Sequence, residues 1–160
     1  MAGLVPCQAA WRHFGGDNGV VNAHKRGLND ADIGAIVETV VQCAAEGHAV
    51  RSLDLGGNSL TDAGLGFVAN LLLGPPATCG GLTSLNLSWN PLLKMRSEVA
   101  LRQLGKALEH LPSLGSLDLS GVQLQGKAAV RLVESLDKCW SLRSLSLAGC
   151  GLGRMDQADC

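Results

Sequence analysis

The sequence repeats one short pattern of leucines four times, and this repetition restricts the chain to a repeat architecture. The four segments are RSLDLGGNSL from Arg51, TSLNLSWNPL from Thr83, GSLDLSGVQL from Gly115 and RSLSLAGCGL from Arg143. With a weaker first copy, the leucines near the end of the pattern are Leu28, Leu60, Leu92, Leu124 and Leu152. The steps between them are 32, 32, 32 and 28 residues, which predicts about 4.5 copies starting near residues 18, 50, 82, 114 and 142.

Each copy predicts a short strand followed by a turn. Alternate residues of a strand point to the same side, so the paired leucines of the copies should face one core. These are Leu53 and Leu55, Leu85 and Leu87, Leu117 and Leu119, and Leu145 and Leu147. Asn58 and Asn90 follow two of the strands and can bond backbone groups in the turn. Val122 holds the same place in the next copy, so its turn must satisfy its backbone in another way.

A helical pattern follows the turns. Thr61 or Asp62 should cap a helix whose apolar face carries Leu65, Val68, Leu71 and Leu72. Ser97 should cap another, with an apolar stripe made of Val99, Leu101, Leu104, Leu108 and Leu111. Pro75, Pro76 and Pro112 should mark helix ends. One unit cannot bury its leucines alone, so the copies should stack into an α/β solenoid.

Two long segments, VRSLDLGGNSLTDAGLGFVANLL and LTSLNLSWNPLLKMRSEVALRQLGKALEHLPS, resemble leucine-rich repeats of the ribonuclease-inhibitor type. The resemblance covers residues 18–152 and implies one leucine-rich repeat domain between an irregular segment, 1–17, and a short tail, 153–160. It implies a curved solenoid with parallel strands on the concave face and helices on the convex face. A narrower resemblance, carried by AAEGHAVRSLDLGGNSL, SWNP and LSGVQLQG, is to the C-terminal repeats of tonsoku-like DNA-repair scaffolds.

The composition argues against several classes of function. The net charge is −1, so no overall field favours nucleic acid or an anionic membrane. Eight basic residues lie between 94 and 143, as solvated helix faces or as a weak basic patch for an acidic partner. Nothing in the sequence resembles a membrane span, and the N-terminus lacks the basic and apolar parts of a signal peptide. We therefore expect an intracellular protein, in the cytoplasm or nucleus, without direct contact to nucleic acid or membrane.

The cysteines and the scattered polar residues do not predict chemistry. Cys43 and Cys139 fall near the ends of predicted helices, and Cys150 takes the place of the turn asparagine, so we expect small buried side chains and neither disulfides nor zinc. Asp54 and Asp118 lie two copies apart, too far for a catalytic carboxylate pair. The glycine-rich GGNSLTDAG lacks the lysine of a phosphate loop. The sequence thus predicts a protein that is not an enzyme and needs no cofactor or metal.

The face of the strands opposite the leucines should present columns of small polar residues. The first column is Ser52, Ser84, Ser116 and Ser144, the second is Asp54, Asn86, Asp118 and Ser146, and the third is Gly56, Ser88, Ser120 and Ala148.

Trp89 borders these columns, at the position where three other copies have Gly57, Gly121 and Gly149. Hot-spot residues of interfaces are often tryptophan. The hypothetical binding residues are therefore Trp89, Asp54, Asn86, Asp118, Ser88 and Ser120. The alternatives are that the columns only bind water and one another, and that Trp89 clamps its own turn over Pro91.

These observations predict a protein–protein interaction module that binds a partner through the concave face and the strand-exit loops. One alternative is a regulator of a small GTPase, similar to the Ran activator, with His24, Lys25 and Arg26 facing an acidic partner. Another is a structural subunit or fragment of a larger assembly such as a DNA-repair scaffold. The last copy has a strand and a turn but no helix, so we expect its leucines to be covered by a partner or by further repeats.

Overall fold

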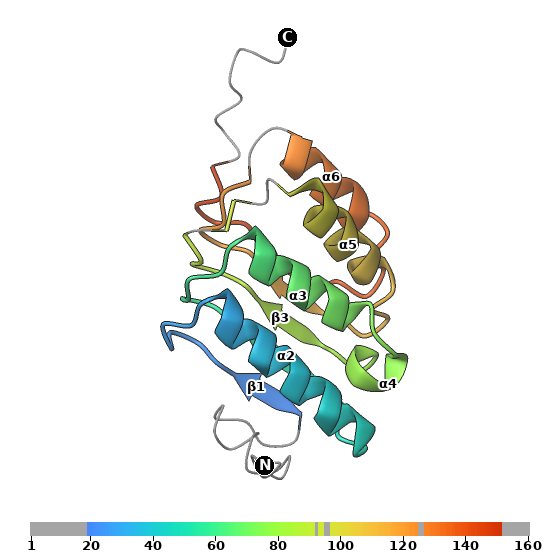
Figure 1. Cartoon of the computed structure of the whole chain (residues 1–160). Helices are drawn as coiled ribbons and strands as arrows, with labels where there is room; N and C mark the ends of the chain where they lie inside the picture. Colours follow the sequence, from blue (N-terminus) through green and yellow to red (C-terminus); the bar gives the residue numbers. More distant parts are fainter. Residues whose placement is uncertain (1–18, 92, 95–96, 125–126, 152–160) are drawn as a thin grey trace.

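The computed structural model describes residues 19–91, 93–94, 97–124 and 127–151, which form an α/β repeat fold (Figure 1). One parallel sheet forms the first layer, and a row of helices forms the second. The strands are β1 (Val20–Asn22), β2 (Ser52–Asp54), β3 (Ser84–Asn86), β4 (Ser116–Asp118) and β5 (Ser144–Ser146). The segments 1–17 and 153–160, Leu92 and Leu152 lie outside the described residues, and the domain boundaries stay predictions.

The strands follow one another across the sheet in chain order, each parallel to the next. Their pairing places five residues in one row: Val20, Ser52, Ser84, Ser116 and Ser144. Neighbours in this row are 32, 32, 32 and 28 residues apart, which is the spacing of the leucines in the sequence. The curvature of the solenoid stays a prediction.

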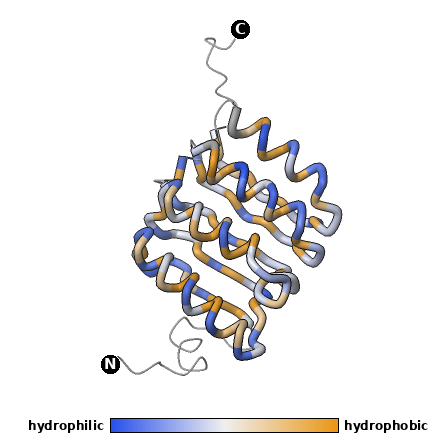
Figure 2. The backbone as a smooth tube through the Cα atoms, turned by 45° about the vertical axis from the view of Figure 1, so that its right-hand side comes forward, coloured by the Kyte–Doolittle hydropathy of each residue, from blue (hydrophilic) through white to orange (hydrophobic). Residues whose placement is uncertain are grey.

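Helices connect the strands and stand on the same side of the sheet (Figure 1). They are α2 (Asp30–Ala45), α3 (Asp62–Leu72), α4 (Pro76–Cys79), α5 (Glu98–Glu109) and α6 (Lys127–Leu136). Hydrophobic and hydrophilic residues alternate along the longer helices in Figure 2, as expected for helices with one buried face. We call the other face of the sheet, which carries the side chains of the first and second columns, the open face.

The helix starts are tied to the preceding copy by carboxylates. Thr61 caps α3, as predicted, with its side chain accepting the N–H of Ala63 at 3.2 Å. Ser97 caps α5, also as predicted. Asp30, in the first turn of α2, accepts the N–H of Thr61 at 2.9 Å. Asp62, in the first turn of α3, accepts the N–H of Ser97 at 2.6 Å. Each cap is thereby held by the helix before it.

The short helix α4 differs from the prediction. Pro75 and Pro76 were expected to mark the end of a helix, and α3 does end before them, at Leu72. Pro76, however, also begins α4. A proline fits this first position because its missing N–H would have no partner inside the helix.

The predicted column of leucines forms the core. Six of its members are 0–1% exposed, namely Leu53, Leu55, Leu85, Leu87, Leu117 and Leu119. The predicted stripe of α3, made of Leu65, Val68, Leu71 and Leu72, is buried in the same cluster. Leu145 belongs to the same column, but in the last copy, whose leucines were expected to need cover from a partner or further repeats, and it is 41% exposed. Because β5 is the last strand of the described sheet, no further unit within the described residues packs on its outer side.

Two positions near α5 differ from the sequence prediction. Val99 was placed in the buried stripe but is 64% exposed. The buried face instead includes Ala100, Leu104 and Ala107, and a helical turn of 3.6 residues carries Val99 away from it.

The second difference is a shift of one residue in the third copy. The N–H of Ser59 donates to the carbonyl of Leu28 at 2.8 Å, but the equivalent bond from Gln123 reaches Leu93 at 3.2 Å. Leu93, fully buried, therefore takes the place predicted for Leu92.

The cysteines divide into two kinds. Cys79, Cys139 and Cys150 are buried and free, as small side chains of the core. Cys43 is also buried, on α2, but it is disulfide-bonded. The prediction that the cysteines form no disulfide is therefore wrong for Cys43. Its position on a helix predicted burial correctly, but a sequence spacing cannot exclude a bond to a distant segment.

The thiol of Cys79 predicts a loss of stability at high pH. Burial raises the pKa of this thiol from 9.0 to about 12. The unfolded chain therefore loses this proton at a lower pH than the folded chain. The contribution of Cys79 to stability is complete below about pH 9 and is lost as the pH rises from there toward about 12. Chemical denaturation should show a steeper loss of stability between about pH 8 and 10.5 for the wild type than for Cys79→Ala. Equal slopes would contradict the burial of this thiol.

The leucine column predicts that replacing different leucines of one row with alanine lowers the free energy of unfolding by unequal amounts. Leu117 and Leu145 are partners in the register of β4 and β5, but Leu117 is 1% exposed and Leu145 is 41% exposed. Leu117→Ala should lower the free energy of unfolding by about 2–5 kcal/mol, from lost burial and a cavity. The matched control Leu145→Ala should cost less than about 1 kcal/mol. Denaturation with urea measures both values, and equal costs would contradict the placement of the row.

Candidate binding surface at the strand exits

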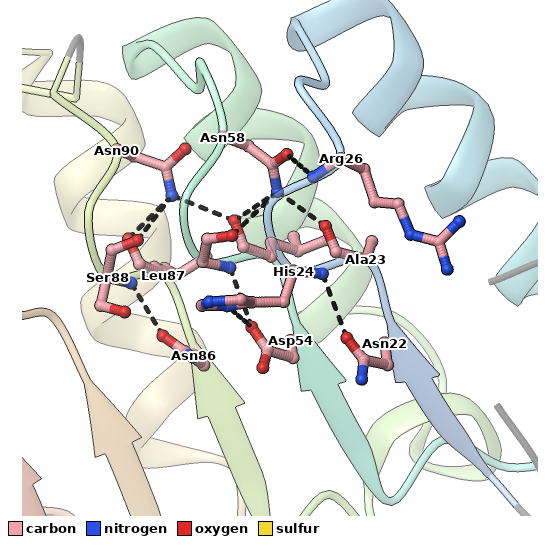
Figure 3. Close-up of polar contacts among 12 residues, drawn as sticks. Asn22, Ala23, His24, Arg26, Asp54, Asn58, Asn86, Leu87, Ser88 and Asn90 are labelled. Carbon is pink, nitrogen blue, oxygen red and sulfur yellow. Dashed lines mark hydrogen bonds and ion pairs between the residues drawn. The ribbon is translucent and has the colours of Figure 1, made fainter. Parts of the chain in front are cut away.

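The chain leaves each strand through a turn in which the buried asparagines bond two copies together. The side-chain amide of Asn58 donates to the carbonyls of Leu55 in its own copy and Ala23 in the preceding one, both at 2.9 Å. Its oxygen accepts the N–H of Arg26 at 3.1 Å (Figure 3). The predicted role of asparagine in these turns is confirmed. The bonds also reach the neighbouring copy, which the sequence pattern did not indicate.

Asn90 repeats this arrangement one copy later. Its amide donates to the carbonyls of Leu87 at 2.9 Å and Leu55 at 3.1 Å, and its oxygen accepts the N–H of Leu60 at 3.0 Å. Asn90 is fully buried. A buried amide in such a place must have its bonds satisfied, and here the backbone of two copies satisfies them.

Copies without the asparagine satisfy the turn with backbone and thiol groups. The N–H of Val122 donates to the carbonyl of Leu119 at 3.1 Å, as expected for a turn that lacks a side-chain donor. The thiol of Cys150 donates to the same carbonyl at 3.0 Å, and the backbone carbonyl of Cys150 accepts the N–H of Leu124 at 3.0 Å. Cys150 thus reproduces, with weaker groups, the links that Asn90 makes.

The second polar column holds the start of each turn. Asp54, Asn86 and Asp118 each use one oxygen to accept the N–H two residues later, at 2.9 Å in all three. This local bond explains why aspartate and asparagine alternate here, since both have the required oxygen. The three side chains remain half-buried, so the rest of each can face a partner on the open face.

His24 closes the N-terminal part of this column. Its Nδ1 lies 3.1 Å from Oδ1 of Asp54 (Figure 3). A methyl group built on Gly56 would lie 2.8 Å from that nitrogen and 3.0 Å from Nδ2 of Asn86. The absence of a side chain at Gly56 leaves room for the imidazole of His24 and the amide of Asn86, which lie directly over it. His24 is engaged with Asp54 rather than standing free for an acidic partner.

Two of the predicted binding residues are buried. Ser88 is 2% exposed and Ser120 is 6% exposed. The hydroxyl of Ser120 shares a hydrogen bond of 2.7 Å with that of Ser146. Ser88 and Ser120 lie in the predicted third column, but they offer little surface to another protein. Trp89, Asp54, Asn86 and Asp118 are the members of the predicted set with accessible surface.

A column of left-handed residues runs along the turns beside these side chains. It contains Lys25, Gly57, Trp89, Gly121 and Gly149, whose φ angles are 52°, 69°, 53°, 74° and 72°. Lys25 and Trp89 are the two residues of the described chain, other than glycine, with positive φ. Each of their side chains lies over the glycine of the next copy, because a methyl group on Gly57 or Gly121 would overlap them. Each side chain thus lies 32 residues before the glycine that it covers, which is the spacing of the copies.

The indole of Trp89 lies against Gly121 of the next copy. The methyl group built on Gly121 would lie 2.7 Å from Cε3 and 3.1 Å from both Cδ2 and Cζ3 of the indole. Cδ2 and Cζ3, the ring atoms bonded to Cε3, are nearly as close to this methyl group as Cε3 is. The methyl position therefore lies above the face of the ring and not beyond its edge. Trp89 is nevertheless 60% exposed. One ring face therefore packs on Gly121, and the opposite face is open to solvent.

A comparison with protein families agrees with this architecture. A family model described as Leucine Rich repeat matches residues 48–69, which contain β2, the turn of Asn58 and most of α3. The match supports a leucine-rich repeat protein, and such domains are generally protein-interaction modules without enzymatic activity. No curated protein matches the chain. Among the described residues, no helix could cross a membrane, and no group of His, Cys, Asp and Glu could hold a metal ion.

The buried asparagines predict a large effect of a small substitution. Asn90→Ala removes the side-chain partner of the Leu87 carbonyl and of the Leu60 N–H in a buried turn, while the Leu55 carbonyl keeps its bond from Asn58. Because buried groups left without partners cost about 1–3 kcal/mol each, the loss of these two bonds should lower the free energy of unfolding by at least about 2 kcal/mol. Asn86→Ser is the matched control, since Ser146 already occupies this column, and it should cost less than about 1 kcal/mol. A small effect of Asn90→Ala in urea denaturation would show that the turn finds its bonds elsewhere.

Proposed function

We propose that this leucine-rich repeat chain is a non-enzymatic module that binds another protein across the open face and the strand-exit turns. The observation that carries the proposal is the position of Trp89. An indole that is 60% exposed lies beside the half-buried polar column, in a turn where three other copies have glycine. Tryptophan is the residue most often found as an interface hot spot, together with tyrosine and arginine.

The backbone of Trp89 supports this proposal. A residue other than glycine in the left-handed region costs about 1–3 kcal/mol, and such strain often occurs at ligand-binding sites. Glycine at 57, 121 and 149 adopts the same conformation without that cost. Folding alone therefore favours glycine at 89, while a large indole there adds contact area for a partner.

The partner would lie along the exits of β2, β3 and β4. It would contact Trp89, Asp54, Asn86 and Asp118, while buried Ser88 and Ser120 would support the surface from below. If the sheet curves as in repeats of the ribonuclease-inhibitor type, this surface is the concave face. A partner that extends past β5 would also cover Leu145.

A second candidate function is the regulation of a small GTPase. It is supported by Lys25, which lies over Gly57 at the β1 exit, and by Arg26, which is exposed beside it. Two cations at one end of the turn column could contact an acidic partner. A role as part of a larger assembly, such as a DNA-repair scaffold, rests on sequence resemblance alone. An intracellular location rests on the sequence alone.

Photo-crosslinking from the two faces tests the proposed function. A photoreactive residue at Ser116, on the open face, should capture a partner from a cell lysate, and the same residue at Phe67, exposed on α3, should not. Mass spectrometry would identify the captured protein, and a GTPase would favour the second candidate. Capture from Phe67 alone would place the interface on the helices and contradict the proposal.

Trp89→Gly tests the residue that carries the proposal. It should leave the melting temperature unchanged or higher, because glycine removes the backbone strain. It should weaken binding of the captured partner by about 2 kcal/mol or more, measured by calorimetry. A lower melting temperature with unchanged affinity would instead make Trp89 a structural clamp.

A further inference from the structure

We infer that Trp89 and Asp118 form a subsite for a positively charged side chain, an arginine or lysine of the bound partner. The inference rests on the proposed function and adds the chemistry of the partner. It depends on three features of the strand-exit turns, which are the free face of the indole, the position of the Asp118 carboxylate and the distribution of the basic residues.

The indole offers a flat platform. One face of its six-membered ring packs on Gly121, and 60% of the residue remains exposed. The backbone N–H of Trp89 donates to the carbonyl of Ser120 at 2.7 Å and holds the backbone of Trp89 beside the next copy. Cations bind the faces of aromatic rings, and tryptophan is the strongest such partner among side chains. A ring with one open face is suited to a guanidinium or ammonium group.

A carboxylate stands at the same turn. Asp118 Oδ1 accepts the N–H of Ser120 at 2.9 Å, and Ser120 directly precedes the glycine on which the indole lies. The other carboxylate oxygen has no hydrogen-bond or ion-pair partner within the described part of the chain. Asp118 thereby differs from Asp54, which faces His24, and from Glu109, which pairs with Lys138 at 2.9 Å. A half-buried carboxylate without a cation of its own can pair with one from a partner.

Within the described ranges, the basic residues of this edge lie away from Asp118. Lys25 and Arg26 are at the exit of β1, two strands before β3, which is about 10 Å at the usual strand spacing. Lys94 follows Trp89 in the chain, but its N–H donates to Asp62 at 3.2 Å, at the start of α3. A cation from a partner would therefore meet attraction near β4 and repulsion near β1. This distribution favours a basic residue at Trp89 over an acidic one.

Peptide pools with one fixed residue test the inference. Four fluorescent pools would carry arginine, lysine, leucine or glutamate at the centre of an otherwise random, uncharged sequence, and anisotropy would measure their binding to the full chain. We expect the arginine and lysine pools to bind at least about fivefold more tightly than the leucine pool, and the glutamate pool to bind most weakly.

The variants are chosen so that the fold tolerates them. Asp118→Asn keeps the oxygen that accepts the Ser120 N–H, as Asn86 does in its own copy, but removes the charge. It should reduce the preference for arginine by about fivefold, as should Trp89→Gly. Glu38→Gln removes an equal charge from the exposed side of α2, away from the open face, and serves as the control, with less than a twofold effect.

A second pair of variants moves the indole without removing it. Gly121→Ala would displace Trp89, while Gly149→Ala has the same left-handed strain but places its methyl group only near the Gly121 backbone, at 3.8 Å. The arginine preference should fall in the first variant and persist in the second.

Three results would overturn the inference. The first is binding of the leucine or glutamate pool as tight as that of the arginine pool. The second is an arginine preference that survives both Trp89→Gly and Asp118→Asn. The third is no binding of any pool. A Trp89-dependent preference for leucine would reject the cationic partner and leave the proposed interaction surface intact, whereas capture by Phe67 alone in the crosslinking experiment would reject that surface itself.

Discussion

The structure depends on the inability of any single copy to bury its own polar backbone and its own leucines. Each turn leaves carbonyls and N–H groups in a buried place, and Asn58 and Asn90 satisfy them by bonding their own copy and the preceding one. Asp30 and Asp62 link the helix starts in the same way. Stability is therefore shared between neighbours, as expected for a solenoid-like array.

This sharing frees the turn column for other uses. The hydrogen bonds of the turn do not use the side chain of the adjacent left-handed residue, and glycine serves at 57, 121 and 149. The glycines in turn make room for a large side chain from the copy before, which is how Lys25 and Trp89 lie flat along the edge. A binding residue can thus be added to one copy at the cost of local strain, without changing the stack.

The candidate surface was only partly predictable. Asp54, Asn86 and Asp118 could be placed on the open face because strand alternation fixes their side. Their second task, accepting the N–H two residues later, was not recognised, although aspartate and asparagine at strand exits often do this. The burial of Ser88 and Ser120 could not be predicted, since alternation gives the direction of a side chain but not what lies above it.

The sequence by itself determined the repeat, its spacing, the leucine column and the helix caps, because each follows from short-range periodicity and local hydrogen bonding. Only the tertiary structure decided which contacts form between copies. It placed the indole of Trp89 on Gly121, exposed Leu145 at the last described strand and moved Leu93 into the place expected for Leu92. These outcomes depend on residues about 30 positions apart, whose meeting is fixed by packing and not by any local pattern.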